Sequence, residues 1–410
     1  MMKMTNRNAP KKTRIVRIDP LKPEKKLLEE AAVILRQGGT VAFPTETVYG
    51  LGANALDPVA VQGIFAAKGR PADNPLIAHI AGRATLEELA ETPSEVEGLV
   101  NLLISRFWPG PLTLILPKKP VVPDVVTGGL DTVAVRMPDH PIALALIAAA
   151  GVPVAAPSAN TSGRPSPTTA AHVIADLDGK VEMIIDGGPT GIGVESTVLD
   201  LTTRVPTLLR PGGVALEDLR ALVGEVELDR GLQDRESKGE GGRGRGLEDE
   251  AHAHFKPRAP GMKYTHYAPR ARVILVEGTN EGTDVEAIRE AVAHLAQKLL
   301  EGGRRVGIMA TSETQALYRQ RFLKGEAGTA QERAEAKASR ASADRTPRVV
   351  VKSAGTRLDP GTIATSLFRL LREFDTDNVE VIIAEGIPAS GLGLAVMNRL
   401  RKAASEIVEV

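Results

Sequence analysis

The sequence predicts an α/β protein of two domains joined by a long linker. The chain has 410 residues, which at roughly 150 residues per domain is enough for two or three domains. Helical and strand patterns alternate along most of it, which is typical of helices packed on a sheet. Residues 229–250 interrupt the alternation with 12 charged side chains and six glycines in 22 positions. Because such a segment buries too little apolar surface to offset its ordering entropy, we expect a disordered insertion there.

Composition excludes several classes of protein. Hydrophobic residues make up 42% and charged residues 25%, as in ordinary soluble domains. The 51 basic and 51 acidic side chains leave a formal net charge of +0, which excludes a globally basic nucleic-acid binder. Because cysteine is absent, disulfides, thiolate zinc sites, iron–sulfur clusters and cysteine nucleophiles are excluded as well.

The first 26 residues carry nine basic and two acidic side chains, a local net charge of 9 − 2 = +7. They contain neither serine nor an apolar segment, so we expect a solvated basic arm with weak attraction to RNA rather than a targeting signal. The uncharged run 141–157 is interrupted by glycine and proline, which predicts a buried helix and a buried strand rather than a membrane span. A cytoplasmic protein without a membrane partner is therefore expected.

The first domain alternates strand and helix patterns from residue 24 to about residue 213. We expect strands over 40–43, 75–80, 112–116, 132–136, 152–156, 183–186, 196–201 and 207–210, and helices over 27–35, 58–68, 86–89, 95–107, 142–150 and 170–177. This mixture predicts a mixed-direction sheet covered by helices.

The second domain follows from Arg272 with a more regular alternation. We expect strands over 273–277, 306–310, 349–353 and 379–384, helices over 285–300, 313–319, 363–374 and 392–404, and a second charged insertion over about 324–345. The pattern predicts a small parallel sheet of Rossmann-like topology. No dinucleotide is expected there, because Gly391-Leu392-Gly393 is followed by Val396 where a third glycine should stand, and the chain contains no P-loop motif.

Polar residues follow the first buried strand at Thr45, Glu46 and Thr47. They place donors and acceptors at the carboxyl edge of the sheet, where ligands of α/β proteins commonly bind. A helix N-cap formed by Thr45 or Thr47 explains them equally well.

A cationic turn comes next, where Lys68 and Arg70 flank a glycine. A point charge and a planar guanidinium together suit a polyphosphate, although two solvated surface cations are the commoner explanation of such a pair. The compact turn that leads into the strand over 75–80 favours the ligand site. His79 in that strand is more simply a satisfied core residue than a ligand contact.

Further polar groups lie at later strand ends. Arg136 ends a buried strand and therefore needs an anion or a carboxylate partner. Residues 155–166 offer four hydroxyls and one amide, without a histidine–carboxylate relay, so they suit ligand hydrogen bonds better than nucleophilic catalysis. Residues 194–198 and 209–213 complete the set. His252 and His254 lack a third ligand at metal spacing, so no metal site is expected.

Several of these motifs together resemble the YrdC-like domain of the L-threonylcarbamoyladenylate synthases. The similar segments are 43–52, 68–71, 108–113, 158–160 and 195–197. Residues 263–269, which include His-Tyr-Ala-Pro, are similar to the linker of the long form of that family. The resemblance implies a basic arm over 1–19, a YrdC-like catalytic domain over 20–215 with a twisted mixed sheet and a concave basic cavity, a linker with a lid motif over 216–271, and a small Rossmann-like domain over 272–410.

The resemblance also implies an activity. A nucleotidyltransferase of this family forms L-threonylcarbamoyl-AMP and pyrophosphate from L-threonine, bicarbonate and ATP with Mg²⁺. The product passes to a tRNA threonylcarbamoyl transferase machinery, which makes N6-threonylcarbamoyladenosine (t6A) next to the anticodon. No side chain is an obvious acid or base, so positioning of the reactants and charge neutralisation would provide the rate enhancement. Mg²⁺ would be held mainly by the phosphates.

The resemblance, carried over residue by residue, also implies which residues form the site. L-Threonine would be held by Thr47, His79, Arg136, the backbone at Ala156, and Ser196. ATP would be held by Lys68, Arg70, Asn74, Thr132, Ser158, Ser166, Arg210 and, from the linker, Tyr267.

Two other functions compete with this interpretation. An RNA-binding or ribosome-maturation module of the same fold should carry base-stacking aromatics, whereas only 3% of these residues are aromatic. A carbamoyl transferase that uses carbamoyl phosphate typically carries cysteine-rich zinc modules, and this chain has no cysteine.

Overall fold

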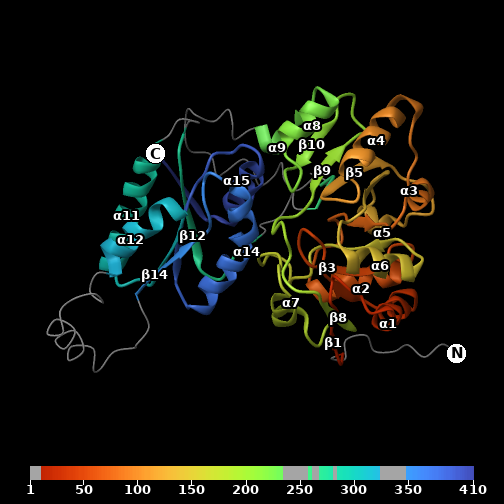
Figure 1. Ribbon diagram of the computed structural model, residues 1–410, viewed down its shortest axis with the longest axis horizontal. Coiled ribbons are helices and arrows are strands. Elements are labelled where there is room, and N and C mark those ends of the chain that lie inside the picture. Colours follow the sequence, from red (N-terminus) through yellow and green to blue (C-terminus); the bar gives the residue numbers. More distant parts are fainter. Residues whose placement is uncertain (1–10, 234–256, 261–266, 280–283, 324–347) are drawn as a thin grey trace. The chain divides into compact units, whose positions relative to one another are not determined.

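The computed structural model describes residues 11–233, 257–260, 267–279, 284–323 and 348–410 (Figure 1). The chain divides into two compact units. Unit 1 comprises Met1–Ser162 and Ser166–Tyr264, and unit 2 comprises Gly163–Pro165 and Thr265–Val410. Several predicted features lie outside the described residues: most of the insertion over 229–250, from residue 234, His252 and His254, part of the lid motif, and the second insertion over 324–345. The described part of the first insertion is not disordered as expected, because residues 230–233 form a short helix.

Unit 1 is built on an eleven-stranded sheet with the order β1-β8-β2-β3-β7-β4-β6-β5-β9-β10-β11. The strands are β1 (Arg14–Arg17), β2 (Val41–Phe43), β3 (Gly50–Asn54), β4 (Ile77–His79), β5 (Leu112–Pro117), β6 (Thr132–Arg136), β7 (Val154–Ala155), β8 (Met183–Asp186), β9 (Thr197–Asp200), β10 (Thr207–Arg210) and β11 (Glu227–Leu228). Pairs such as β4 and β6 are parallel, whereas β5 and β6 are antiparallel. The predicted mixed-direction sheet is confirmed.

The helices of unit 1 begin and end largely at the expected signals. They are α1 (Lys25–Arg36), α2 (Pro58–Lys68), α3 (Arg83–Leu89), α4 (Ser94–Phe107), α5 (Asp124–Thr127), α6 (Pro141–Ala150), α7 (Ala170–Leu177), α8 (Leu216–Val223) and α9 (Arg230–Gln233). In α2 the Asp57 carboxylate accepts from Val59 N at 2.8 Å, and Gly69 ends the helix with φ 60°. This ending places Lys68 in the last helical turn, directly before the cationic turn.

One apolar cluster of unit 1 fills the space between α1, α6 and the strands beside them. It includes Leu28, Leu35, Phe43, Leu146 and Ile185, all of which are nearly inaccessible to solvent. The alternation of alanine and larger apolar residues in α1 and α6 lets the two helices pack against each other and on the sheet.

Some strands form where the sequence did not predict them. Residues 14–17, in the expected basic arm, pair in parallel with β8; Val16 is buried, while Arg14, Ile15 and Arg17 stay exposed. Residues 50–54 form β3 despite two glycines. A Cβ on Gly52 would lie 2.7 Å from side-chain atoms of Phe43 and Val154, so glycine is required for this close packing. Helix α8 and strand β11 lie within the range expected as linker.

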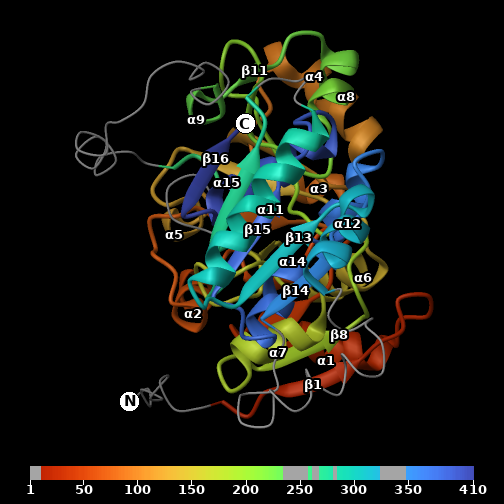
Figure 2. The same ribbon diagram turned by 90° about the vertical axis from the view of Figure 1, so that its left-hand side faces the viewer.

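Unit 2 is a parallel sheet with helices on both faces. Its elements are β12 (Arg272–Glu277), α11 (Val285–Glu301), β13 (Val306–Ala310), α12 (Ser312–Leu323), β14 (Val349–Ser353), α14 (Pro360–Thr376), β15 (Val381–Glu385), α15 (Leu392–Ala403) and β16 (Glu406–Glu409). All pairs in the order β14-β13-β15-β12-β16 are parallel. Helices α11 and α12 cover one face, and α14 and α15 cover the other (Figures 1 and 2).

The strand order of unit 2 differs from that of a dinucleotide-binding domain, because β15 lies between β12 and β13. The predicted parallel α/β sheet is confirmed all the same. Within the described ranges, none of the helices combines the length and apolarity needed to cross a bilayer.

Candidate functional site

Sheet pairing in unit 1 brings together three residues predicted for L-threonine. The parallel strands β4 and β6 place His79 opposite Arg136. On the other side of β4 lies β7, and Ala156, just after it, donates its main-chain N–H to Ile77 O at 3.0 Å. The side chains of His79 and Arg136 are 3% and 4% exposed, so both lie in the interior.

The turn between β2 and β3 adds Thr47 to this group. Its hydroxyl accepts from Arg136 Nη1 at 3.0 Å. Thr45 has a local role, because its hydroxyl accepts from the main-chain N–H of Thr47 at 3.2 Å and of Val48 at 3.3 Å. A strand rather than a helix follows, so the N-cap interpretation is wrong.

Arg136 has the carboxylate partner that its burial requires. Its Nη2 lies 2.6 Å from Glu46 Oε1, and its Nε donates to Gly110 O at 3.2 Å. Nε and Nη1 each donate one hydrogen bond to a protein oxygen, whereas Nη2 has no hydrogen-bond partner among the described residues, so N–H groups remain that can serve a ligand.

His79 is held as a neutral imidazole. Its Nδ1 lies 3.2 Å from Ile77 O. Burial, and after it the positive charge of Arg136, lowers the pKa of His79 to about 3. The side chain can therefore offer hydrogen bonds at neutral pH without adding a charge.

Ser196 and Arg210 meet near the carboxyl end of β6. Arg210 donates to Ser196 Oγ and to Ser196 O, both at 3.1 Å, and Thr113 Oγ lies 2.8 Å from Ser196 Oγ. Gly212 permits this arrangement, because a Cβ there would lie 2.3 Å from the main chain of Ser196. A residue predicted for threonine and one predicted for ATP are thus direct neighbours.

A second cluster forms from Lys68 and Arg70, the K-x-R motif, and from Ser158 and Asn160, the S-x-N motif. Lys68 is 2% exposed, and its ammonium donates to Asn160 O at 2.7 Å and to the main-chain oxygen of Ser158. The Ser158 hydroxyl donates to Asn160 Oδ1 at 2.6 Å. Solvated surface cations do not explain this motif, because Lys68 is buried.

Asn74 has a buried side-chain amide without hydrogen-bond partners. Arg70 holds the turn from outside, donating to Pro75 O at 3.2 Å. The Asn74 side chain is 1% exposed, yet neither its amide nitrogen nor its amide oxygen has a hydrogen-bond partner among the described residues. Buried amides are rarely left unsatisfied, so the position favours contact with a bound molecule.

The predicted ATP residues are not all in one place. Thr132 begins β6 and Arg136 ends it, so the two lie roughly 13 Å apart along the strand. The opposite, amino end of the β4–β6 pair carries Asn74, which precedes β4, and Ser158, which follows the antiparallel β7. Lys68 lies there too, because it donates to Ser158 O. Ser166 instead donates to Glu195 Oε1 at 2.5 Å, next to Ser196.

Tyr267 belongs to unit 2. Its ring stacks on Phe368 with centroids 5.1 Å apart, and the Arg399 guanidinium carbon lies 5.7 Å from its centroid. Its predicted contact with ATP stays a prediction, and the rest of the lid motif, residues 263–266, lies outside the described part of the chain.

Sequence reasoning gave no role to Glu46 and Glu195, although both lie inside the motifs. Glu46 is the counter-ion of Arg136, and Glu195 accepts from Ser166. The requirement that a buried arginine have a carboxylate partner could have identified Glu46, which stands one residue before a predicted threonine contact.

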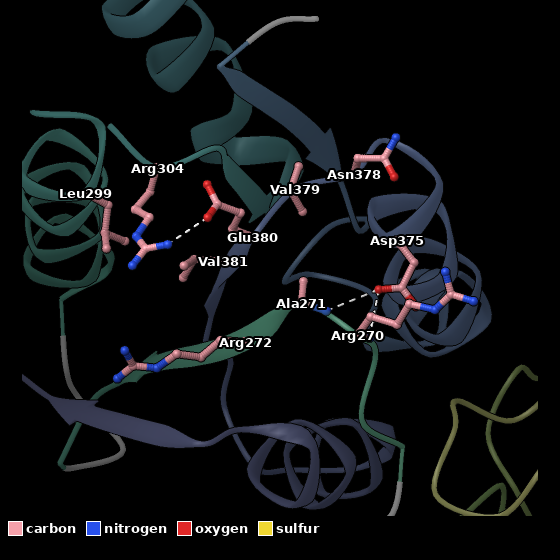
Figure 3. A pocket seen from close by; sticks show the side chains of 10 residues that line it. All are labelled: Arg270, Ala271, Arg272, Leu299, Arg304, Asp375, Asn378, Val379, Glu380 and Val381. Carbon is pink, nitrogen blue, oxygen red and sulfur yellow. Dashed lines mark hydrogen bonds and ion pairs between the residues drawn. The ribbon is translucent and has the colours of Figure 1, made fainter. Parts of the chain in front are cut away.

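Unit 2 contains a pocket of about 520 Å³ at the amino ends of β12 and β15 (Figure 3). Its lining residues are Arg270, Ala271, Arg272, Leu299, Arg304, Asp375, Asn378, Val379, Glu380 and Val381. Arg304 donates to Glu380 at 2.7 Å, and Arg272 pairs with Glu406. No residue predicted for the site lines this pocket, which lies at the opposite edge from the one that commonly binds ligands in parallel sheets.

Comparison with known proteins covers both units. Residues 33–212 match a family model described as "Telomere recombination", and residues 214–405 match one described as "Threonylcarbamoyl-AMP synthase, C-terminal domain". A threonylcarbamoyl-AMP synthase of Bacillus subtilis is 47% identical over 94% of this chain and 95% of its own length. A threonylcarbamoyl-AMP synthase of Pyrococcus abyssi is 49% identical over 91% of this chain and 92% of its own length.

A solved structure agrees with these matches. The crystal structure of P. abyssi Sua5 complexed with L-threonine superimposes with a TM-score of 0.78 at 46% identity, covering 97% of this chain and all of the other. The predicted fold class, a YrdC-like domain followed by a small α/β domain, is thereby confirmed. By identity over nearly its whole length, the chain belongs to the threonylcarbamoyl-AMP synthase family.

Proposed function

We propose that this chain forms L-threonylcarbamoyl-AMP and pyrophosphate from L-threonine, bicarbonate and ATP. The observation that carries the proposal is the near-complete match to a Sua5 protein whose crystal structure is complexed with L-threonine. Relatives that are 38–49% identical over most of the chain are named for the same activity.

Threonine binding is assigned to the residues at the carboxyl ends of β4 and β6. The N–H groups of Arg136 that donate to no protein atom suit the α-carboxylate, because a planar guanidinium matches two carboxylate oxygens. The hydroxyls of Thr47 and Ser196 and the neutral His79 suit the polar groups of the amino acid. All four side chains are buried, so their hydrogen bonds are strong relative to those at a surface.

ATP binding is assigned to the cluster at the other side of the β4–β6 pair. Lys68 and Arg70 bring positive charge, Asn74 brings a buried amide, and Ser158 and Thr132 bring hydroxyls. Ser166 and Arg210 lie beside Ser196, so we place the reacting phosphate between the two clusters. We also assign Tyr267 of the linker to cover the nucleotide.

The reaction follows from this placement. The amine of threonine bonds to the carbon of bicarbonate and a C–O bond of bicarbonate breaks, which gives an N-carboxylate and water. One oxygen of the N-carboxylate then attacks the α-phosphate of ATP while pyrophosphate leaves. Lys68, Arg70 and Arg210 would offset the negative charge of the phosphates, and the buried hydrogen bonds would hold the reactants in line. We assign Mg²⁺ to the ATP complex, since no three His, Asp or Glu side chains gather among the described residues.

The product is proposed to serve t6A formation on tRNA through a separate transferase machinery, in the cytoplasm. An RNA-binding module and a carbamoyl transferase are the competing functions, and neither explains the buried Lys68, Asn74 and Arg136 as well as an amino acid and a nucleotide do. Contact with RNA through the basic N-terminal residues remains a secondary proposal.

The decisive experiment measures pyrophosphate release by the purified chain. We expect release only when L-threonine, bicarbonate and ATP with Mg²⁺ are all present, and a product with the mass of threonylcarbamoyl-AMP. Release without threonine, or with carbamoyl phosphate in place of bicarbonate and threonine, would contradict the proposal.

A further inference from the structure

Glu46 is a buried carboxylate with an incomplete set of partners. Its side chain is 12% exposed, and its Oε1 lies 2.6 Å from Arg136 Nη2. The contact is an ion pair without hydrogen-bond geometry, and among the described residues neither carboxylate oxygen receives a hydrogen bond. A carboxylate accepts up to four hydrogen bonds, and leaving them unmade in a buried position is unfavourable.

The position of Glu46 is fixed by its own main chain. Ile192 N donates to Glu46 O at 2.8 Å, and Gly193 N donates to Thr47 O at 3.0 Å. Thr45 closes the turn on the other side through its hydroxyl. Because the turn is held from two directions, the main chain of Glu46 is fixed, and its carboxylate lies beside Arg136.

Charged and titratable groups lie near Glu46 on several elements. Arg136 faces it from β6, and His79, neutral at physiological pH, stands beside Arg136 on β4. In the segment before α6, His140 is close enough to be affected by the charges of Glu46 and of the exposed Asp139. Burial lowers the pKa of His140, while the negative charges of Glu46 and Asp139 raise it. Arg136 is thus the cation paired with Glu46, and the carboxylate oxygens of Glu46 could still accept hydrogen bonds from a second, cationic donor.

We propose that Glu46 binds the α-ammonium group of L-threonine and accepts a proton from it. This inference rests on the proposed function and adds a catalytic residue to it. The Arg136–Glu46 pair presents a positive and a negative group side by side, which complements the carboxylate and ammonium of a zwitterionic amino acid. The three N–H groups of an ammonium would supply the hydrogen bonds that the Glu46 oxygens lack.

The proton transfer completes the chemistry of the first step. One ammonium proton moves to the Glu46 carboxylate, which frees the nitrogen lone pair to bond to the bicarbonate carbon. The C–O bond to the bicarbonate hydroxyl breaks, and that hydroxide leaves as water with the second nitrogen proton. The N-carboxylate and a protonated Glu46 remain, so atoms and charge balance. A positioned base of this kind typically accelerates a reaction by 10²–10⁴-fold.

Binding measurements test the ammonium contact without requiring turnover. L-Threonine is compared with 3-hydroxybutyrate, which keeps the carboxylate and hydroxyl but lacks the amine, on the wild type and on Glu46→Gln. We expect the wild type to bind threonine more tightly than 3-hydroxybutyrate. In Glu46→Gln the ratio of the two dissociation constants should fall by about 10- to 100-fold, which corresponds to the loss of one charge-assisted hydrogen bond. Glu46→Asp, which keeps the charge, should retain most of it.

A matched control is Glu182→Gln. Glu182, directly before β8, is also partly buried, and its carboxylate accepts from the main-chain N–H and the hydroxyl of Thr40. We expect its replacement to leave the preference for threonine unchanged. Because the comparison is between two ligands on the same variant, a general loss of stability does not alter the ratio.

The pH dependence of turnover tests the proton transfer. Without the carboxylate, the rate of Glu46→Gln should rise in proportion to the fraction of threonine present as free amine, close to tenfold per pH unit below the pKa of the amine. Wild-type turnover should rise less steeply. Parallel profiles for the two proteins would overturn the assignment of Glu46 as base, and an unchanged ligand preference would overturn the ammonium contact. Failure of wild type to bind threonine would instead contradict the proposed function itself.

Discussion

Lys68 donates its buried ammonium to the main-chain oxygen of Asn160 at 2.7 Å, although 92 positions separate the two residues. The same ammonium reaches the main-chain oxygen of Ser158. These contacts join the end of α2 to the loop after β7, so the K-x-R and S-x-N motifs form one structural unit. Lys68 therefore stabilises the loop that carries two predicted ligand groups.

Replacing Lys68 should affect stability as well as ATP binding. We expect Lys68→Met to lower the free energy of unfolding by about 2–3 kcal/mol, because the carbonyls of Ser158 and Asn160 lose a charged donor. The apparent KM for ATP should rise at the same time. Urea unfolding and steady-state kinetics measure the two effects, with Lys25→Met, at an exposed position of α1, as the control. Unchanged stability would contradict the structural role.

Arg136 should control threonine rather than ATP. We expect Arg136→Ala to abolish threonine-dependent turnover while ATP binding stays largely intact, as calorimetry with each ligand would show. The unfolding free energy should also fall by about 3–5 kcal/mol, because Glu46 is left buried without its counter-ion. Adding Glu46→Gln should recover part of this loss. Equal losses of affinity for both ligands would instead identify Arg136 as a structural or nucleotide residue.

His79 should make stability depend on pH. Its pKa is lowered from 6.5 to about 3 in the folded chain. Below pH 6.5 the unfolded chain takes up a proton that the folded chain does not, so stability falls as the pH falls, by up to about 1.4 kcal/mol per pH unit, until the folded pKa is reached. His79→Gln should lack this contribution. Urea unfolding at about pH 7 and about pH 5 measures it, with the exposed His294→Gln as control; equal slopes for wild type and His79→Gln would contradict the prediction.

Unit 2 should bind no second nucleotide. Gly391 opens α15, but the third position of a phosphate-binding fingerprint is Val396, and two arginines of the pocket in Figure 3 are engaged by Glu380 and Glu406. We expect calorimetry to give one ATP per chain. Saturable ATP binding at micromolar concentration by a fragment of residues 272–410 would show the prediction to be wrong.

Tyr267 should influence ATP although it packs within unit 2. Tyr267→Ala removes the ring that stacks on Phe368, and we expect it to raise the apparent KM for ATP or to uncouple ATP hydrolysis from product formation. Tyr267→Phe keeps the stack and should behave like wild type. Deleting residues 229–250 should leave activity near normal. Wild-type kinetics for Tyr267→Ala would mean that the linker only connects the domains.

The sequence by itself determined most of the local structure. The strands over 132–136, 183–186, 207–210, 306–310 and 349–353 and the helices over 58–68 and 170–177 have the predicted bounds. These segments are apolar at the period of their own element and are bounded by strong turn or cap residues, so local signals suffice. The polar residues singled out in the sequence also include Lys68, His79, Arg136 and Ser196, which now belong to the candidate site of unit 1.

Tertiary structure alone decided which of those residues meet. Arg136 reaches Thr47 across 89 positions, and it lies beside His79 because β6 pairs with β4, a partnership that no local pattern specifies. Strand β3 depends on tertiary structure in the same way. Its glycines are unfavourable for a strand by local propensity, but Gly52 allows the close packing of Phe43 and Val154. Strand order and register are set by long-range burial, so the ion pair of Glu46 with Arg136 became visible only once the sheet was assembled.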